Sequence, residues 1–209
     1  MSYDAVIFDI GGVVVGSPLH AIADYERASG IAPGTINRII VSAGAEGSWA
    51  RLERGELTTE EFFPIFDREC AAAGCRASGR AMMGAMAEVT VPRPAMLTAI
   101  ERIRASGRKT AALTNNWKSG QPDLQPLASC FDVIVESAIE GIRKPDPRIY
   151  ELACARLDVA ASAAVFLDDI GANLKAARSL GMTTIKVVEP ATALAELAAL
   201  LEIDLLDGA

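Results

Sequence analysis

Short apolar runs alternate with longer stretches of mixed apolar and polar residues over much of this chain. Five of the runs are rich in Val, Ile and Phe and lack regular polar alternation, which predicts strands that are buried on both faces. These runs are A-V-I-F at 5–8, K-T-A-A-L-T at 109–114, F-D-V-I-V-E at 131–136, A-V-F-L at 164–167 and T-T-I-K-V-V at 183–188.

Apolar residues recur at helical spacing between the later runs. The spacing predicts helices over 94–105, 147–157, 173–180 and 191–201. Strands that alternate with helices of about ten residues favour βαβ crossovers and a parallel sheet. We therefore expect an α/β fold with a doubly wound, Rossmann-like parallel sheet.

Residues 16–90 interrupt this alternation, because they contain no convincing strand. Ser17 followed by Pro18 has the pattern of a helix N-terminus, and Thr58 with Glu61 has the pattern of a capping box. The segment is therefore expected to be helical and to form a separate subdomain.

The position of this segment predicts the domain organisation. It follows the first strand directly, and Pro92 and Pro94 mark the return to the alternating pattern. We expect a core domain made of residues 1–15 plus 91–209, with residues 16–90 inserted into it as a helical cap.

Polar residues follow four of the five predicted strands, where ligands bind in open parallel sheets. They are Asp9 after the first strand, Thr114 and Asn115 at the second, Lys144 beyond the third, and Asp168 and Asp169 after the fourth. Singly, most of them have ordinary explanations, such as turns or helix caps. Three converging carboxylates, however, repel one another unless one is protonated or a cation lies between them. Their hard oxygen ligands suit Mg²⁺.

The composition narrows the range of partners. The chain has 209 residues, a net charge of -7 and a pI of about 4.8, which argues against a nucleic-acid partner. No apolar run is long enough to span a bilayer. Residues 1–10 have no basic flank, so we expect no signal peptide. The four cysteines form no C-x-x-C pair, so we expect reduced thiols and a cytoplasmic protein. The oligomeric state stays open.

This ordered set of residues resembles the haloacid-dehalogenase superfamily of hydrolases, in the branch with a helical cap after the first strand. The motifs T-N-N-W, G-I-R-K-P-D-P and F-L-D-D-I-G-A-N-L-K resemble the N-terminal phosphatase domain of soluble epoxide hydrolases. F-D-I-G-G-V-V and G-S-W-A-R-L-E-R-G-E-L-T are more similar to the N-terminal hydrolase-like domain of acyl-CoA dehydrogenase family member 10. We expect the hydrolase-like domain to stand alone here, because 209 residues leave no room for a dehydrogenase or an α/β-hydrolase domain.

The resemblance implies a metal-dependent phosphatase. Asp9 matches the nucleophile that forms an aspartyl-phosphate. Asp9, Asp169 and the backbone carbonyl of Gly11 would hold Mg²⁺, with Asp168 and Asn173 supporting the metal site.

The resemblance also implies a site for the phosphate of a small phosphorylated substrate. Thr114 and Asn115 would donate hydrogen bonds to the phosphoryl oxygens. Lys144 would neutralise charge on the nucleophile and on the phosphoryl group, which is the stabilisation that phosphoryl transfer requires.

One position departs from the family pattern. Phosphatases of this family usually place a second aspartate two residues after the nucleophile, as the general acid and base, and this chain has Gly11 there. Such catalysis contributes typically about 10²–10⁴-fold to the rate, so esters with good leaving groups should suffer least. Three hypotheses remain: a phosphatase, a weak or silent protein that binds a phosphorylated ligand or another protein, and a metal-independent 2-haloacid dehalogenase.

The cap is expected to select the substrate. Trp49 and Arg51 are the predicted substrate-binding residues, with Arg54 as a further candidate, although core packing of Trp49 and a solvated arginine are equally compatible with the sequence. Trp117 is either a pocket wall or an ordinary core residue. His20, the one histidine, is expected on a helix surface rather than as a replacement acid.

Overall fold

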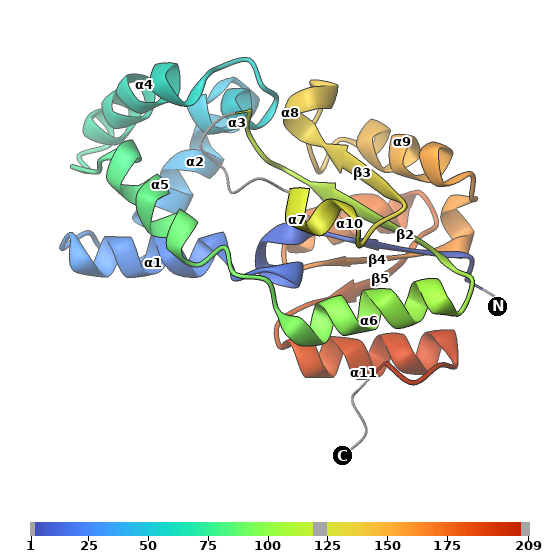
Figure 1. The fold of residues 1–209 in the computed structure, drawn as a ribbon. Coiled ribbons are helices and arrows are strands. Elements are labelled where there is room, and N and C mark those ends of the chain that lie inside the picture. Colours follow the sequence, from blue (N-terminus) through green and yellow to red (C-terminus); the bar gives the residue numbers. More distant parts are fainter. Residues whose placement is uncertain (1–2, 119–124, 206–209) are drawn as a thin grey trace.

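The core of the protein is a five-stranded parallel sheet, seen in the computed structural model, which describes residues 3–118 and 125–205. The order of the strands is β3-β2-β1-β4-β5, so β1 lies in the middle of the sheet (Figure 1). The strands are β1 (Ala5–Phe8), β2 (Lys109–Thr114), β3 (Val133–Glu136), β4 (Ala164–Asp168) and β5 (Thr183–Lys186). The expected α/β fold with a doubly wound parallel sheet is confirmed.

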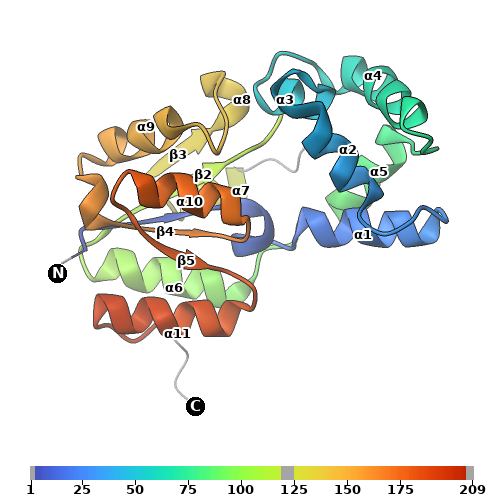
Figure 2. The ribbon, with the colours of Figure 1, turned by 180° about the vertical axis from the view of Figure 1, so that it is seen from behind.

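Helices cover both faces of this sheet, as the two opposite views show (Figures 1 and 2). One face carries α6 (Pro94–Ala105) and α11 (Pro190–Leu201), and the other carries α9 (Pro147–Leu157) and α10 (Gly171–Ser179). Along β1, Val6 and Phe8 pack toward α6 and α11, whereas Ala5 and Ile7 pack toward α9 and α10. Burial on both faces explains why the strands read as continuous apolar runs.

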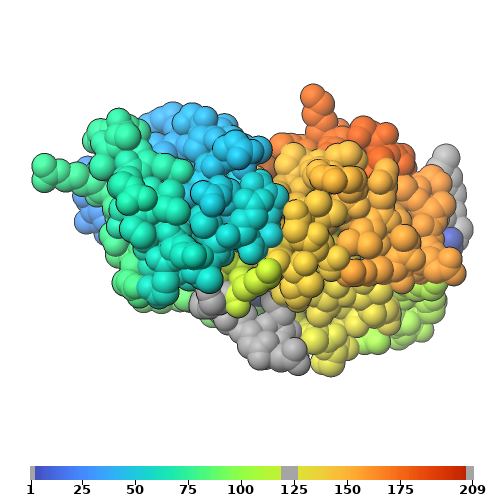
Figure 3. All heavy atoms as spheres, turned by 90° about the horizontal axis from the view of Figure 1, so that it is seen from above, coloured from blue at the N-terminus to red at the C-terminus, as the bar shows by residue number. Residues whose placement is uncertain are grey.

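The segment between β1 and α6 is helical and carries its own apolar core. Its helices are α1 (Pro18–Ala28), α2 (Thr35–Ala43), α3 (Ser48–Glu53), α4 (Thr59–Ala72) and α5 (Gly79–Glu88), with a short 3₁₀ turn at Gly44–Glu46. We call α1 to α5 the cap. Phe62, Phe66 and Met82 are among the fully buried residues of its core. Thr58 forms the expected capping box with Glu61. The space-filling view shows the cap beside the sheet region (Figure 3).

Two adjacent segments of chain connect the cap to the sheet. The chain leaves β1 through a tight turn, Ile10–Val14, in which the Val15 N–H donates to the Ile10 carbonyl, and Val15 pairs with Pro92 where the chain returns. Arg93 braces the turn, since its guanidinium donates to the carbonyl oxygens of Gly12 at 2.8 Å and Val13 at 3.1 Å. This arrangement holds the residues that follow Asp9 in place.

The remaining elements are α7 (Gln125–Ala128), α8 (Ser137–Glu140) and a 3₁₀ turn at Ala161–Ala163. The third strand begins two residues later than the sequence predicts. Asp132 lies directly before this strand, and its carboxylate accepts a hydrogen bond from the Thr110 backbone N–H at 2.8 Å. A residue inside the strand would accept such a bond through its backbone carbonyl. In the part of the chain that the structure describes, every helix is too short or too polar to cross a membrane.

Candidate active site

The candidate active site lies at the carboxyl ends of β1 and β4. These strands are neighbours in the sheet although about 155 residues separate them in the sequence, because the strand order reverses between them. Asp9 directly follows β1, and Asp168 ends β4. The topology therefore places Asp9 and Asp168 side by side.

A glycine turn follows Asp9. The carboxylate of Asp9 accepts a hydrogen bond from the backbone of Ile10 at 2.7 Å. Gly12 has a φ of +80°, and a Cβ there would lie 2.2 Å from Oδ2 of Asp169. Only glycine meets both requirements, since it accepts positive φ and leaves room for the carboxylate. The G-G pair of the sequence thus lets Asp169 approach the turn.

Lys144 joins two of the carboxylates. Its Nζ lies 2.8 Å from Oδ1 of Asp9 and 2.8 Å from Oδ2 of Asp168, and its side chain is 1 % exposed. Asn115 fixes the backbone of this lysine: its Oδ1 accepts from the Lys144 N–H at 2.9 Å, and its Nδ2 donates to the Lys144 carbonyl at 3.1 Å. The Asn115 amide therefore positions the lysine, a role the sequence did not indicate.

Asp168 is fully buried, and both of its oxygens are engaged. One accepts from the backbone of Ile170 at 2.7 Å, and the amide of Asn173 donates to both, at 3.2 and 3.0 Å. Lys144 takes the remaining side. This set of contacts fits a supporting role, in which Asp168 orients the lysine and the start of α10.

Asp169 has fewer contacts and is only partly buried. Its Oδ2 accepts a hydrogen bond from the Ser17 hydroxyl at 3.4 Å. Ser17 occupies the N-cap position of α1, as the sequence suggested, but its side chain makes no capping bond there. The hydroxyl instead links the entry to the cap with the carboxylate cluster.

The electrostatics of the cluster show an excess of negative charge. Burial raises the pKa of Asp9 well above its usual value, with Lys144 opposing this and Asp168 and Asp169 adding to it. Burial, then repulsion from Asp168, also raises the pKa of Asp169. The pKa of Lys144 is raised as well: burial works against its charge, but attraction to Asp168 and Asp9 outweighs it. One ammonium thus faces three carboxylates and cannot balance them all.

These residues fit a bound Mg²⁺. One carboxylate oxygen from each of Asp9, Asp168 and Asp169 lies within 4.8 Å of the others. A divalent cation would offset the uncompensated negative charge of these buried carboxylates, and Mg²⁺ prefers oxygen ligands. Asp9 and Asp169 have the freer oxygens, so they are the better direct ligands.

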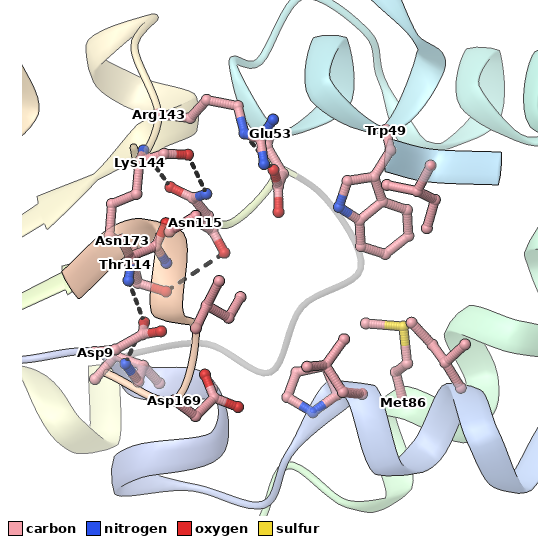
Figure 4. A pocket seen from close by; sticks show the side chains of 18 of the residues that line it. Asp9, Trp49, Glu53, Met86, Thr114, Asn115, Arg143, Lys144, Asp169 and Asn173 are labelled. Carbon is pink, nitrogen blue, oxygen red and sulfur yellow. Dashed lines mark hydrogen bonds and ion pairs between the residues drawn. The ribbon is translucent and has the colours of Figure 1, made fainter. Parts of the chain in front are cut away.

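The cluster opens into a cavity of about 310 Å³ between the sheet and the cap (Figure 4). Thr114, Asn115, Lys144 and Asn173 line it on the sheet side together with Asp9, Gly11 and Asp169. The opposite wall comes from the cap. Its lining residues are Pro18, Leu19, Ile22, Asn37, Ile40, Val41, Trp49, Glu53 and Met86.

The predicted cap residues divide between the cavity and the surface. Trp49 lines the cavity, and its ring meets that of Trp117 edge-on at 5.9 Å, so both tryptophans serve as wall and as packing. Arg51 is not among the lining residues and lies 3.6 Å from Glu56 instead. Positions two apart point to different sides of a helix. Arg54 also pairs with Glu56, and His20 is exposed on α1.

Sequence reasoning missed an ion pair between the cap and the sheet region, formed by a buried glutamate and a half-buried arginine. Nε of Arg143 lies 2.6 Å from Oε2 of Glu53, without the alignment of a hydrogen bond, and both residues line the cavity. Burial raises the pKa of Glu53, against the opposing effect of Arg143 and of a hydrogen bond with Trp49. Arg143 stands next to Lys144 in G-I-R-K-P-D-P, but its partner is ninety positions away, so no local signal identifies the pair.

The fold and the site define a family. The sequence profile of the haloacid dehalogenase-like hydrolases matches residues 3–181. The chain therefore belongs to the haloacid dehalogenase-like hydrolases.

Curated relatives agree with this assignment. Acyl-CoA dehydrogenase family member 10 of Mus musculus is 46% identical over 205 residues, which cover 96% of this chain and 19% of that protein. Bifunctional epoxide hydrolase 2 of Sus scrofa is 34% identical over 214 residues, covering 94% of this chain and 38% of that protein. This chain thus spans well under half the length of either relative. Phosphatase MT3486 of Mycobacterium tuberculosis, 30% identical, matches over 87% of this chain and 86% of its own length.

A solved structure shares the fold. A haloacid dehalogenase family enzyme of Bacteroides thetaiotaomicron, in complex with magnesium and inorganic phosphate, superposes with a TM-score of 0.63. It is 18% identical, and the match covers 90% of this chain and 96% of that one. At this identity the likeness concerns the fold alone.

Proposed function

We propose that this chain is a Mg²⁺-dependent phosphatase that acts on a small phosphorylated metabolite through an aspartyl-phosphate. One observation carries the proposal: a buried carboxylate, Asp9, opens into a cavity with one lysine ammonium at 2.8 Å and two further carboxylates within 4.8 Å. This combination supplies a nucleophile, a cation for phosphoryl oxygens and ligands for a metal.

The first half of the reaction transfers the phosphoryl group to the protein. An oxygen of Asp9 attacks phosphorus, the bond between phosphorus and the ester oxygen breaks, and the electron pair leaves with that oxygen. Lys144 and Thr114 line the sheet side of the cavity, from which the ammonium and the hydroxyl would face the phosphoryl oxygens. Mg²⁺, held by Asp9, Asp169 and the Gly11 carbonyl, would offset the negative charge of the phosphate and of the nucleophile.

The second half releases phosphate. Water attacks the phosphorus of the aspartyl-phosphate, the bond to Asp9 breaks, and the electron pair restores the carboxylate. The water proton passes to the phosphate product. The hydrogen bonds of Asn115 and Asn173 hold Lys144 and Asp168 in place during both steps.

Two further findings support the proposal. A relative that matches over most of its own length, at 30% identity, is named a phosphatase, and the fold recurs in an enzyme bound to magnesium and phosphate. The activities of the two longer relatives as whole proteins are not assigned to this chain, which spans 19% and 38% of them.

Release of phosphate from 4-nitrophenyl phosphate tests the proposal, with Mg²⁺ and with chelator. We expect turnover that requires Mg²⁺ and that Asp9→Asn abolishes. Asp24→Asn serves as the matched control, since Asp24 is an exposed aspartate paired with Arg27 on the cap surface. Equal rates for the wild type and Asp9→Asn would refute a phosphatase that uses this carboxylate.

Gly11 favours a second candidate, a protein that binds a phosphorylated ligand without turning it over. Calorimetric titration with a non-hydrolysed phosphonate distinguishes the two. Tight binding that needs Mg²⁺, together with no release from any ester, would support the silent protein. Release of chloride from 2-chloropropionate in the presence of chelator would instead support a dehalogenase.

A further inference from the structure

The space beside Gly11 is filled by a group that has no proton to give. A Cβ at Gly11 would lie 3.0 Å from Cγ and 3.2 Å from Cδ of Pro18, the first residue of the cap. The backbone does not require glycine here, because φ is -67° and ψ is 125°. Glycine at this position therefore makes room for the Pro18 ring and is not needed for the backbone angles of the turn.

The titratable side chains that line the cavity, among the described residues, are Asp9, Glu53, Arg143, Lys144 and Asp169. Three of them belong to the carboxylate cluster and its lysine. Glu53 and Arg143 pair with each other across the junction of cap and sheet. Glu53 is the one group among them that could replace the missing acid. Burial raises its pKa, whereas Arg143, at 2.6 Å across the junction of cap and sheet, opposes its protonation.

The rest of the cavity offers little help to a departing anion. The cap wall opposite the carboxylates is mainly apolar, with Leu19, Ile22, Ile40, Val41, Trp49 and Met86 among its residues. An alkoxide released against such a wall, without a proton donor, would be costly. A leaving group that is already stable as an anion avoids this cost.

The second half of the proposed reaction points the same way. There the site must expel a carboxylate, that of Asp9, from phosphorus without protonating it. An acyl phosphate makes the same demand in the first half, since its leaving group is also a carboxylate. A site without a general acid thus suits substrates whose leaving group, like the Asp9 carboxylate, is stable as an unprotonated anion.

We propose, on the basis of the phosphatase function above, that the substrates are phosphates of apolar compounds with stable leaving anions, meaning acyl, enol or aryl phosphates rather than alkyl phosphates. Asp9 forms its bond to phosphorus, the bond to the leaving oxygen breaks, and the organic anion departs with the electron pair and without a proton.

A series of similar size but different leaving groups tests this class: benzoyl, 4-nitrophenyl, phenyl and benzyl phosphate. The measured quantity is kcat/KM for phosphate release, with the rate of Asp9→Asn subtracted to remove spontaneous hydrolysis. We expect kcat/KM to fall steeply as the leaving anion becomes more basic, with benzyl phosphate lowest. A flat series, or benzyl phosphate as good as phenyl phosphate, would overturn the inference. No Asp9-dependent release from any member would instead overturn the phosphatase function itself.

Two variants sharpen the result. Gly11→Asp in a Pro18→Ala background restores a carboxyl group with room for its Cβ, and should raise kcat/KM for benzyl phosphate relative to benzoyl phosphate by up to about 10²-fold. Pro18→Ala alone is the control for folding and for the cap. Glu53→Gln should lower kcat/KM for all four substrates by a similar factor. A selective loss of kcat/KM for benzyl phosphate would identify Glu53 as an acid and overturn the inference.

Discussion

The two walls of the cavity differ in how their residues are held. On the sheet wall, Lys144 contacts two carboxylates through its ammonium, and two hydrogen bonds from Asn115 hold its backbone. On the cap wall, the lining residues Leu19 and Val41 are 41 % and 69 % exposed. The comparison teaches that the reacting groups are held by a network of polar contacts, whereas the shape that meets the substrate rests mainly on apolar contacts, with the ion pair of Glu53 and Arg143 as the polar exception.

This contrast assigns different kinetic roles to the walls. A change on the sheet wall should act on charge stabilisation in the transition state and so lower kcat. A change on the cap wall should remove binding that is equal in the ground and transition states, and so raise KM. Three predictions test this division, in order of decreasing effect.

The largest effect is expected for Lys144→Met. The variant leaves Asp9 and Asp168 buried without their cation, which costs about 3–5 kcal/mol of stability. It also removes the charge that faces the phosphoryl oxygens, so kcat for 4-nitrophenyl phosphate should fall about 10²–10³-fold. Lys175→Met, at an exposed position on α10, is the control. A kcat within threefold of the wild type would contradict the role of the lysine.

The next effect concerns the metal and compares two glycines. Gly12 has φ +80° and Asp169 beside it, whereas Gly107 has φ +84° and open space where a Cβ would lie. Alanine at either position costs about 1–2 kcal/mol for the backbone. Only Gly12→Ala displaces Asp169, so it alone should raise the Mg²⁺ concentration for half-maximal activity, by about tenfold, equivalent to 1.4 kcal/mol.

Thermal melting and Mg²⁺ titration of both variants check this. Both melting temperatures should fall because the backbone cost is shared, and that of Gly12→Ala should fall at least as far because this variant also displaces Asp169. If Gly12→Ala and Gly107→Ala showed the same Mg²⁺ dependence, Asp169 would not be a ligand that the turn positions.

Much of the sheet wall could be predicted from the sequence, and physics explains why. Parallel strands end at one edge, so Asp9, Thr114 and Asp168 had to lie on the same side of the sheet once the strands were recognised. The strand order could not be predicted, because nothing in the apolar runs says that β1 pairs with β4. The adjacency of Asp9 and Asp168 is therefore a result of the structure.

The cap wall was predicted less well, because it depends on contacts between distant segments. Arg51 was expected to bind substrate and instead faces Glu56. The pairing of Glu53 with Arg143 and the packing of Pro18 beside Gly11 each join positions with no shared local pattern. Helical spacing in the sequence identifies the apolar face of a helix, but it does not say which distant segment of the chain that face contacts.

The smallest predicted effect tests the cap wall directly. Leu19 lines the cavity, and Leu19→Ser removes part of an apolar contact worth about 1 kcal/mol, so KM for an aryl phosphate should rise about fivefold with kcat unchanged. Inhibition by inorganic phosphate, which has no apolar part, should stay the same. Val188→Ser is the control, since Val188 is 80 % exposed and is not a lining residue. A loss of kcat in Leu19→Ser with KM unchanged would show that the cap wall takes part in the chemistry, and the division between the two walls would fail.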